Sequence, residues 1–280
     1  MMNLPHPFDF TQSKLQDYMD CPYRFYLRYL LDLKWPALLV DDAITFEQRG
    51  QTGARFHRLI QQYLLGVPQN QLDELAAADI NPEVKTWWDD FLVYIPPQLT
   101  GQQFVEMILT TTLDEQRLLA KYDLILRKNE RHWIIFDWKT SQNLPRKDWL
   151  MDRMQTRLYP WVLTQMINAL GNHEASEPDQ ITMKYWFATH PESPVELRYN
   201  HEMYNADTAF FRKIINEILS KDETEFTRTL DSKKCHFCVY RSHCDRGIKA
   251  GELAAYEDFS LENEAMRFDM DFDQISEIQF

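Results

Sequence analysis

The order of helical and extended segments in this 280-residue sequence predicts an α/β fold with a mixed central sheet. Three strand-like runs follow one another with only short polar turns between them, which favours an antiparallel meander. A predicted helix separates the third run from a fourth, and a connection through a helix allows the fourth strand to lie parallel to the third. We therefore expect one mixed sheet flanked by helices.

Each element is predicted from its apolar spacing and its flanking turn residues. Helices are expected at 11–33, 46–65, 84–93, 147–170 and 206–221. Strands are expected at 104–113, 117–126, 132–138, 181–188 and 195–199. Two prolines lie inside these helices. Pro22 should break or bend the first one, and Pro160 should cost roughly 3 kcal/mol or kink the fourth.

The composition excludes several classes of protein. Hydrophobic residues make up 44% and aromatics 14%, enough for a substantial core. The sequence has 7 glycines and contains neither GxxxxGK[ST] nor GxGxxG, so a P-loop or Rossmann nucleotide site is not supported. No apolar run approaches the roughly 20 residues of a membrane span, and the first residues lack a signal-peptide pattern. We expect a cytoplasmic protein, in which disulfides are rare.

The segment 119–141 carries the most informative polar residues. Asp123 lies within an apolar strand, and Asp137 precedes Lys139 by two residues at the end of the next strand. Alternate residues share a strand face, and hairpin pairing brings Asp123 towards Asp137. Two converging carboxylates suit Mg²⁺ or Mn²⁺, and a lysine beside them can offset developing charge. The alternative is an ordinary ion pair at a strand end.

Two other segments carry polar residues that suit the same site. Gln155 and Tyr159 lie four residues apart on one face of a predicted helix, where they can bind a phosphate or orient a carboxylate. Alone, they are ordinary residues of an amphipathic helix. His57 lies on an upstream helix and is a plausible ligand for Mn²⁺, although a lone histidine is more often a surface or hydrogen-bonded one.

Taken in chain order, these motifs resemble the core of RecB-like nucleases of the PD-(D/E)XK superfamily, including CRISPR-associated RecB-like exonucleases and AddB-type nuclease domains. The motifs are Gly53-x-x-x-His57, Lys121-x-Asp123, Asp137-x-Lys139-Thr140 and Gln155-x-x-x-Tyr159. The resemblance implies a restriction-endonuclease-like core. It implies a metal bound by His57, Asp123, Asp137 and the backbone carbonyl of Trp138, with Lys139 as the catalytic lysine and with Gln155 and Tyr159 in the site. Ala120 departs from the glycine that the family often has there.

The four cysteines form a second candidate site. Cys235, Cys238 and Cys244 fall within ten residues, and Cys21 lies 214 positions before Cys235. Four thiolates suit either zinc or a [4Fe–4S] cluster. The segment 13–25 resembles the opening of the iron–sulfur subset of RecB-like nucleases, which implies a [4Fe–4S] cluster, with zinc as the alternative. This resemblance spans residues 11–247.

The resemblance implies a metal-dependent DNA nuclease, with exonuclease action on single-stranded or end-bearing DNA in repair, recombination or defence. A helicase or another protein is a candidate partner. One nuclease domain is expected over 1–250, with a helical part at 11–100, a catalytic core at 101–200 and a cysteine-bearing part at 201–247. Two alternatives stay open. One is a non-catalytic DNA-binding or assembly subunit with this fold, and the other is a zinc-clasped interaction protein.

The net charge of −13 does not exclude a nucleic-acid partner, because binding depends on local basic patches. Residues 246–280 hold nine acids and three bases, giving −6, so nearly half of the excess lies at one end. We expect an acidic tail over 251–280. It is either a solvated segment or one that competes with DNA for the entrance of the site.

Overall fold

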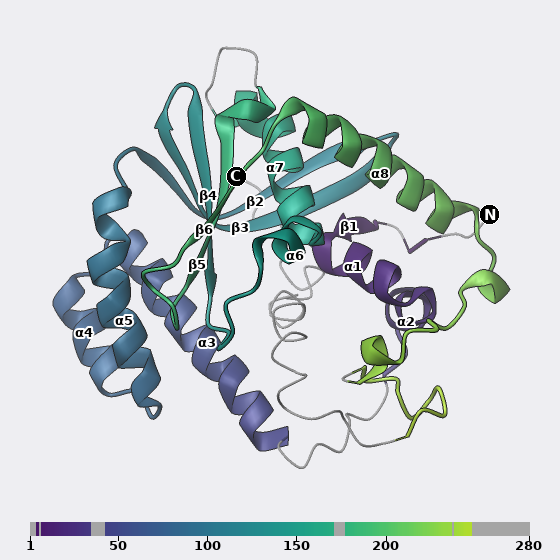
Figure 1. The fold of residues 1–280 in the computed structure, drawn as a ribbon, viewed down its shortest axis with the longest axis horizontal. Helices are drawn as coiled ribbons and strands as arrows, with labels where there is room; N and C mark the ends of the chain where they lie inside the picture. The colour runs from purple at the N-terminus through teal and green to yellow at the C-terminus, as the bar shows by residue number, and fades with distance from the viewer. Residues whose placement is uncertain (1–3, 6, 35–42, 171–176, 237, 248–280) are drawn as a thin grey trace.

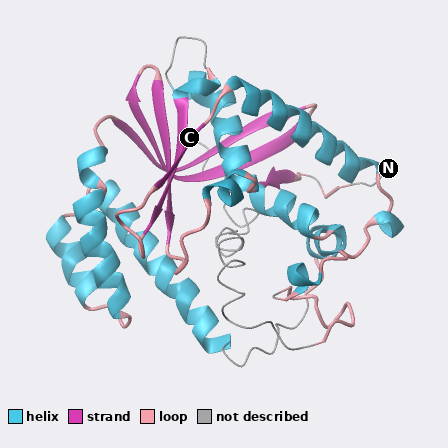
Figure 2. Ribbon diagram, in the orientation of Figure 1, coloured by secondary structure: helices cyan, strands magenta, loops and turns pink. Residues whose placement is uncertain are grey.

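A mixed sheet with helices on both faces forms the framework of the protein (Figures 1 and 2). The computed structural model describes residues 4–5, 7–34, 43–170, 177–236 and 238–247. The expected acidic tail at 251–280 lies outside the described residues. Within the described residues, the α/β architecture with a mixed central sheet agrees with the sequence prediction.

The described strands form one sheet in the order β1-β3-β4-β5-β6, with β2 also paired to β3. They are β1 Asp9–Thr11, β2 Gln102–Leu113, β3 Gln116–Asn129, β4 His132–Lys139, β5 Ile181–Phe187 and β6 Val195–Arg198. Strands β2, β3 and β4 are antiparallel neighbours, and β5 lies parallel to β4. The expected meander and the expected parallel fourth strand are both confirmed.

Helices cover the two faces of the sheet as separate groups (Figure 1). One group contains α3 Ala43–Leu64, α4 Gln69–Ala77 and α5 Pro82–Tyr94, and the other contains α1 Gln12–Asp20, α7 Met154–Met166 and α8 His201–Ser220. Phe136 and Trp138 of β4 pack in the core beneath the first group, whereas Ile135 packs beneath the second. Because strand residues alternate between faces, Asp137 and Lys139 lie on the face covered by α7.

The first helical segment is interrupted where the sequence predicted. Helix α1 ends at Asp20, Cys21 has an extended backbone, and Pro22 begins the short helix α2 Pro22–Phe25, followed by a π-helical turn at Tyr26–Leu30. Proline suits the first helical position because its missing N–H has no partner there. The break places this segment beside the chain that follows α8, where Tyr23 N–H donates to the carbonyl of Thr227 at 3.1 Å.

The helix expected over 147–170 is in fact divided, and the division is not at Pro160. Helix α6 Lys147–Met151 ends before a turn at 152–153, and α7 then continues through Pro160. Packing holds the helix together there, because Pro160 is buried and its carbonyl accepts a hydrogen bond from Thr164 Oγ1 at 2.8 Å. The consequence for the site is that a new helix begins at Met154, one residue before Gln155.

One described strand and one described α-helix have no counterpart among the expected ones. Strand β1 has three residues and pairs in parallel with Arg117–Leu119 of β3. Helix α4 lies between α3 and α5. The last helix also begins earlier than expected, at His201, because Asn200 caps it by accepting a hydrogen bond from Met203 N–H at 2.8 Å.

Candidate functional site

Strand β4 presents a buried acid and a buried base side by side. The Nζ of Lys139 lies 2.7 Å from Oδ2 of Asp137, and both side chains are almost inaccessible to solvent, at 7% and 6% exposure. Lysines and aspartates are rarely buried to this extent unless they are paired. We call Asp123, Asp137 and Lys139 together the carboxylate site.

Asp123 enters this site from the neighbouring strand. Leu124 of β3 pairs with Phe136 of β4, so the preceding Asp123 lies across from Asp137. The backbone N–H of Trp138 donates to Oδ2 of Asp123 at 3.0 Å. Burial raises the pKa of Asp123 well above its usual range, and the charge of Asp137 raises it further, against the opposing effect of Lys139. Without a cation, Asp123 therefore retains a proton to a higher pH than an ordinary aspartate.

Helix α7 contributes the two residues of the predicted Gln–Tyr pair. The amide Nε2 of Gln155 donates to Oδ1 of Asp137, whereas the buried Oδ2 is ion-paired with Lys139 but has no hydrogen-bond partner. The ring of Tyr159 packs on that of Tyr122, with their centroids 4.9 Å apart. Burial raises the pKa of Tyr159 well above its usual range, and the nearby carboxylates of Asp137 and Asp123 add to this. Both residues thus lie against the carboxylate site.

Helix α3 contributes a histidine next to Asp123 of the carboxylate site. Its His57 places Nδ1 3.9 Å from Oδ2 of Asp123. One turn earlier, a Cβ atom on Gly53 would come within 2.8 Å of Oγ1 of Thr140, which follows Lys139. Glycine at this position therefore allows α3 to approach the end of β4 closely. That approach explains physically why a glycine precedes the histidine by four residues.

The carboxylates of Asp123 and Asp137 have the chemistry that a hard divalent cation requires, but their oxygens are not arranged as a complete metal-binding group. Within the described part of the chain, no three His, Cys, Asp or Glu side chains are gathered as a metal-binding group. Two carboxylates nonetheless repel each other here, as the raised pKa of Asp123 indicates. A cation between them would remove that repulsion, and oxygen ligands of this kind are the ones that Mg²⁺ and Mn²⁺ prefer.

The sequence analysis missed one residue of this site, Glu106 on β2. Its φ is +51°, in the left-handed region that residues other than glycine rarely adopt. The pairing of β2 with β3 skips Glu106, with Val105 opposite Leu124 and Met107 opposite Tyr122. The charge of Glu106 contributes to the raised pKa of Asp123. A lone glutamate in a strand carries no signal in the sequence, because the bulge that directs it appears only in the pairing.

A second site lies between the two ends of the described chain. One pocket is lined by all four cysteines, and we call it the cysteine pocket. Cys21 comes from the break between α1 and α2, and its Sγ accepts a hydrogen bond from Thr229 N–H at 3.4 Å. Cys235 ends a 3-10 turn at Ser232–Cys235. The topology therefore brings together cysteines that are more than 200 positions apart in the sequence.

Cations surround the cysteine pocket. Arg246 donates from Nη1 to Sγ of Cys235 at 2.7 Å. Burial alone would lower the pKa of Arg24, but Asp17 and Asp20 raise it, so this buried guanidinium stays charged at the pocket wall. Burial raises the pKa of Cys238 to about 11. Without a metal the thiol of Cys238 is therefore protonated at neutral pH, and the surrounding cations suit a bound group that carries negative charge.

Both sites lie within one family match. The family model of the PD-(D/E)XK nuclease superfamily matches residues 9–245. The chain belongs to the PD-(D/E)XK nuclease superfamily. The matched range includes the carboxylate site and all four cysteines, and the restriction-endonuclease-like core expected from the motifs is the PD-(D/E)XK fold described above.

Solved structures similar to this superfamily member share little sequence with it. One is described as "Crystal structure of SSO0001", at 12% identity and a TM-score of 0.40, covering 86% of this chain and 88% of the other. Another is named a "Putative exonuclease" from Eubacterium rectale, at 10% identity and a TM-score of 0.47, covering 78% and 86%. Among curated proteins, none matches this chain.

Several of the basic residues near the superfamily core are engaged by acids. Lys121 pairs with Glu106 at 2.8 Å, and Arg157 pairs with Asp207 at 2.6 Å. These two side chains are therefore less suited to bind phosphates than their charge alone suggests.

None of the helices in the described ranges is long and apolar enough to span a membrane.

Proposed function

We propose that this chain is a metal-dependent DNA nuclease that hydrolyses phosphodiester bonds. The observation that carries the proposal is the arrangement of Asp123 on one strand beside Asp137 and Lys139 at the end of the neighbouring strand, within a chain that belongs to a nuclease superfamily. Superfamily membership supports hydrolytic chemistry, and the filled motif positions support a competent site rather than a degenerate one.

Each residue of the site has a distinct role in this proposal. Asp123, Asp137, His57 and the backbone carbonyl of Trp138 would hold Mg²⁺ or Mn²⁺. The cation would activate a water molecule and stabilise the charged transition state. Lys139 lies close enough to Asp137 to place its ammonium beside the scissile phosphate and offset the negative charge that develops there.

Two further residues orient the ligands. Gln155 donates to one oxygen of Asp137 and fixes the direction of the other towards Lys139. Tyr159 excludes water from the inner side of both carboxylates by packing against Tyr122. Such supporting contacts matter because partners of metal ligands typically change metal affinity or activity roughly 10- to 100-fold.

For the substrate, we propose DNA that is single-stranded or has free ends, cut as an exonuclease in repair, recombination or defence. This rests on the resemblance of the four motifs to RecB-like enzymes. A helicase or other protein partner follows from the same resemblance, since the nuclease domains of that type work inside larger assemblies.

We further propose that the cysteine pocket holds a [4Fe–4S] cluster through Cys21, Cys235, Cys238 and Cys244, with zinc as the alternative. The shared pocket supports a single four-thiolate centre. The cations that face it favour a centre with net negative charge. Iron analysis, inorganic sulfide analysis and visible absorbance of anaerobically purified protein test this directly. If the analysis finds about one zinc and no iron per chain, the pocket holds zinc and the cluster proposal is wrong.

Time courses with end-labelled single- and double-stranded DNA, in Mg²⁺ and in Mn²⁺, test the nuclease proposal. We expect cleavage by the wild-type chain and none by Asp137→Asn, which keeps the side-chain shape and removes the charge. Stepwise release of single nucleotides would identify an exonuclease. If purified wild-type protein binds DNA but leaves it intact under all these conditions, the non-catalytic alternative replaces the proposal.

A further inference from the structure

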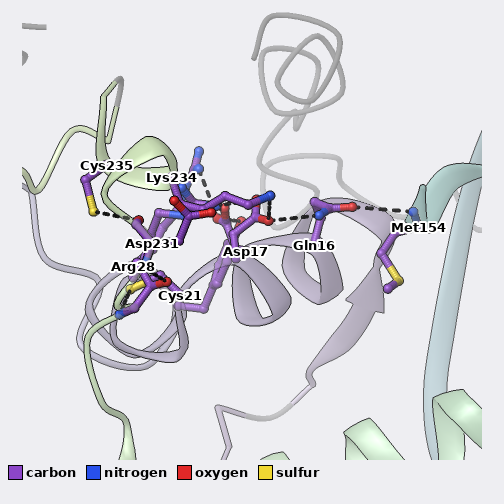
Figure 3. Close-up of polar contacts among 12 residues, drawn as sticks. Gln16, Asp17, Cys21, Arg28, Met154, Asp231, Lys234 and Cys235 are labelled. Atoms are coloured by element: carbon purple, nitrogen blue, oxygen red, sulfur yellow. Dashed lines mark hydrogen bonds and ion pairs between the residues drawn. The ribbon is translucent and has the colours of Figure 1, made fainter. Parts of the chain in front are cut away.

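A hydrogen bond from a distant segment caps the helix that carries Gln155. Arg153, at the N-cap of α7, makes no side-chain capping bond. The N–H of Met154 instead donates to Oε1 of Gln16 on α1 at 3.4 Å (Figure 3). The first N–H groups of a helix have no partner within it, so an acceptor there fixes where and in what direction the helix begins. The next residue, Gln155, contacts Asp137.

The other end of the Gln16 amide is held by a buried carboxylate. Nε2 of Gln16 donates to Oδ1 of Asp20 at 3.1 Å, and both side chains are buried. With its nitrogen engaged as a donor to Asp20, the oxygen of Gln16 is turned towards Met154. Asp20 therefore decides which end of the amide faces α7.

Asp20 is in turn held by two cations that line the cysteine pocket. Nη2 of Arg24 lies 2.9 Å from Oδ2 of Asp20, and Nζ of Lys234 lies 2.7 Å from its Oδ1. Lys234 immediately precedes Cys235, and Figure 3 shows both beside the α1 residues.

These contacts form a short connected path from one site to the other. It runs through Cys235, Lys234, Asp20, Gln16, Met154 and Gln155 to Asp137. Buried polar groups need hydrogen-bond partners in any folded protein. Here the partners also connect Lys234, on the wall of the cysteine pocket, to the first residue of α7, the helix whose Gln155 contacts Asp137.

We propose that Gln16 is a positioning residue for Gln155 and that it conveys the state of the cysteine-pocket wall to the carboxylate site through Asp20 and Lys234. The inference rests on the proposed function for the identity of the bound cation. Lys234 and Arg24 would be shared between Asp20 and a negatively charged group bound in the pocket, so their contacts with Asp20 would weaken when the pocket is filled. The amide of Gln16 would then move between Asp20 and Met154, and the first turn of α7 would move with it.

The test replaces Gln16 by Met in the full-length chain, which keeps the volume and removes both hydrogen bonds. Binding of Mn²⁺ is measured by calorimetry, and the binding lost in Asp137→Asn defines the carboxylate site. We expect roughly 10-fold weaker Mn²⁺ binding in Gln16→Met and faster amide hydrogen exchange at the start of α7. Thr164→Val is the matched control, since it removes a hydrogen bond further along the same helix and should change neither readout.

A second variant tests the same path at its other end, next to the cysteine pocket. Lys234→Met alters a side chain that is 32% exposed, so the fold should tolerate it. We expect Lys234→Met to weaken Mn²⁺ binding a few-fold. The Gln16→Met/Lys234→Met double variant should bind no more weakly than Gln16→Met alone, because both act through one path.

Two results would overturn the inference. One is unchanged Mn²⁺ affinity and unchanged exchange at the start of α7 in a folded Gln16→Met protein. The other is a double variant whose loss equals the product of the two single losses. Hydrogen exchange reads the coupling even if the wild-type chain cleaves no DNA. Failure of the coupling and failure of the proposed nuclease function are therefore separate outcomes.

Discussion

The carboxylate site and the cysteine pocket are built in opposite ways. Asp123, Asp137 and Lys139 lie within 17 consecutive residues, and the register of two neighbouring strands brings them together. The cysteines come from both ends of the described chain and meet only when the whole fold has closed. The acidic and basic residues of the first site are held mainly by local strand pairing, whereas the second site forms only when the two ends of the described chain come together.

The two sites also differ in how they balance charge. The carboxylate site concentrates negative charge, and the pKa of Asp123 rises through burial and through its neighbours Asp137 and Glu106. The cysteine pocket surrounds its thiols with cations such as Arg24 and Arg246. The first arrangement calls for a cation and the second for an anionic centre. One chain thus contains two sites whose proposed occupants carry opposite net charge.

The largest expected effect separates the sites by activity. Asp123→Ala, Asp137→Ala and Lys139→Ala should each reduce DNA cleavage by at least about 100-fold, because each removes a ligand or a charge from the reacting phosphate. Iron content should stay as in the wild type, since none of these three residues lines the cysteine pocket. The measurement is end-labelled DNA cleavage by purified variants. Activity retained by Lys139→Ala would rule out the assigned mechanism.

The next effect compares the sites by stability and iron content. Cys21→Ala should lower the melting temperature by more than about 5 °C, because the proposed centre that links the two ends of the chain would stabilise the folded state as a whole. Differential scanning calorimetry and iron analysis on the variant and on Asp137→Ala make the comparison. Asp137→Ala leaves Lys139 buried without its partner and so also lowers the melting temperature, but it should keep the wild-type iron content. A Cys21→Ala protein with unchanged melting temperature would mean that the cysteines do not join the chain ends.

A smaller effect concerns the approach of α3 to the carboxylate site. Gly53→Ala should weaken Mn²⁺ binding and activity by roughly 10-fold, because its Cβ would meet Thr140 Oγ1 at 2.8 Å and push His57 away from Asp123. Thr140→Ala in the same chain removes that oxygen and should restore part of the loss. If the double variant is as impaired as Gly53→Ala, contact with Thr140 is not the reason for the glycine.

The smallest effect is the pH dependence of the metal-free protein. The pKa of Asp123 in the folded state is raised above its ordinary value of 3.8, so the folded state favours the protonated form. Its contribution to stability is therefore complete below that ordinary value and is lost as the pH rises through the folded pKa. Thermal unfolding in EDTA across this range should show the decline in the wild type. Asp123→Asn should show a flatter profile, and equal slopes would contradict the assignment.

The sequence predicted what depends on local pattern. Three strand-like runs joined by short turns correctly predicted the meander, and Pro22 marked the break next to Cys21. It could not reveal Glu106, because a bulge is a property of two paired strands and not of either one. Strand β1 was missed because three residues are too few to show a period, and its partner lies about 100 positions further along the chain.

The contacts of Gln16 and Asp20 were also beyond the sequence. Both residues appear there as polar positions of an amphipathic helix, which usually face solvent. Their burial depends on α7 and on the chain after α8, which approach α1 only in the folded protein. The break at 152–153 that creates the α7 start had no signal either, because Pro160 is the stronger helix breaker nearby.

The long separation of Cys21 from the other three cysteines determines how late in synthesis all four can be present together. At the usual translation rates of about 5–20 residues per second, the 214 positions between Cys21 and Cys235 take roughly 10–40 s to synthesise. Throughout that interval Cys21 is a thiol without the other three cysteines. The metal centre proposed for this pocket would therefore have to be delivered late, to a chain whose sheet has already had time to form.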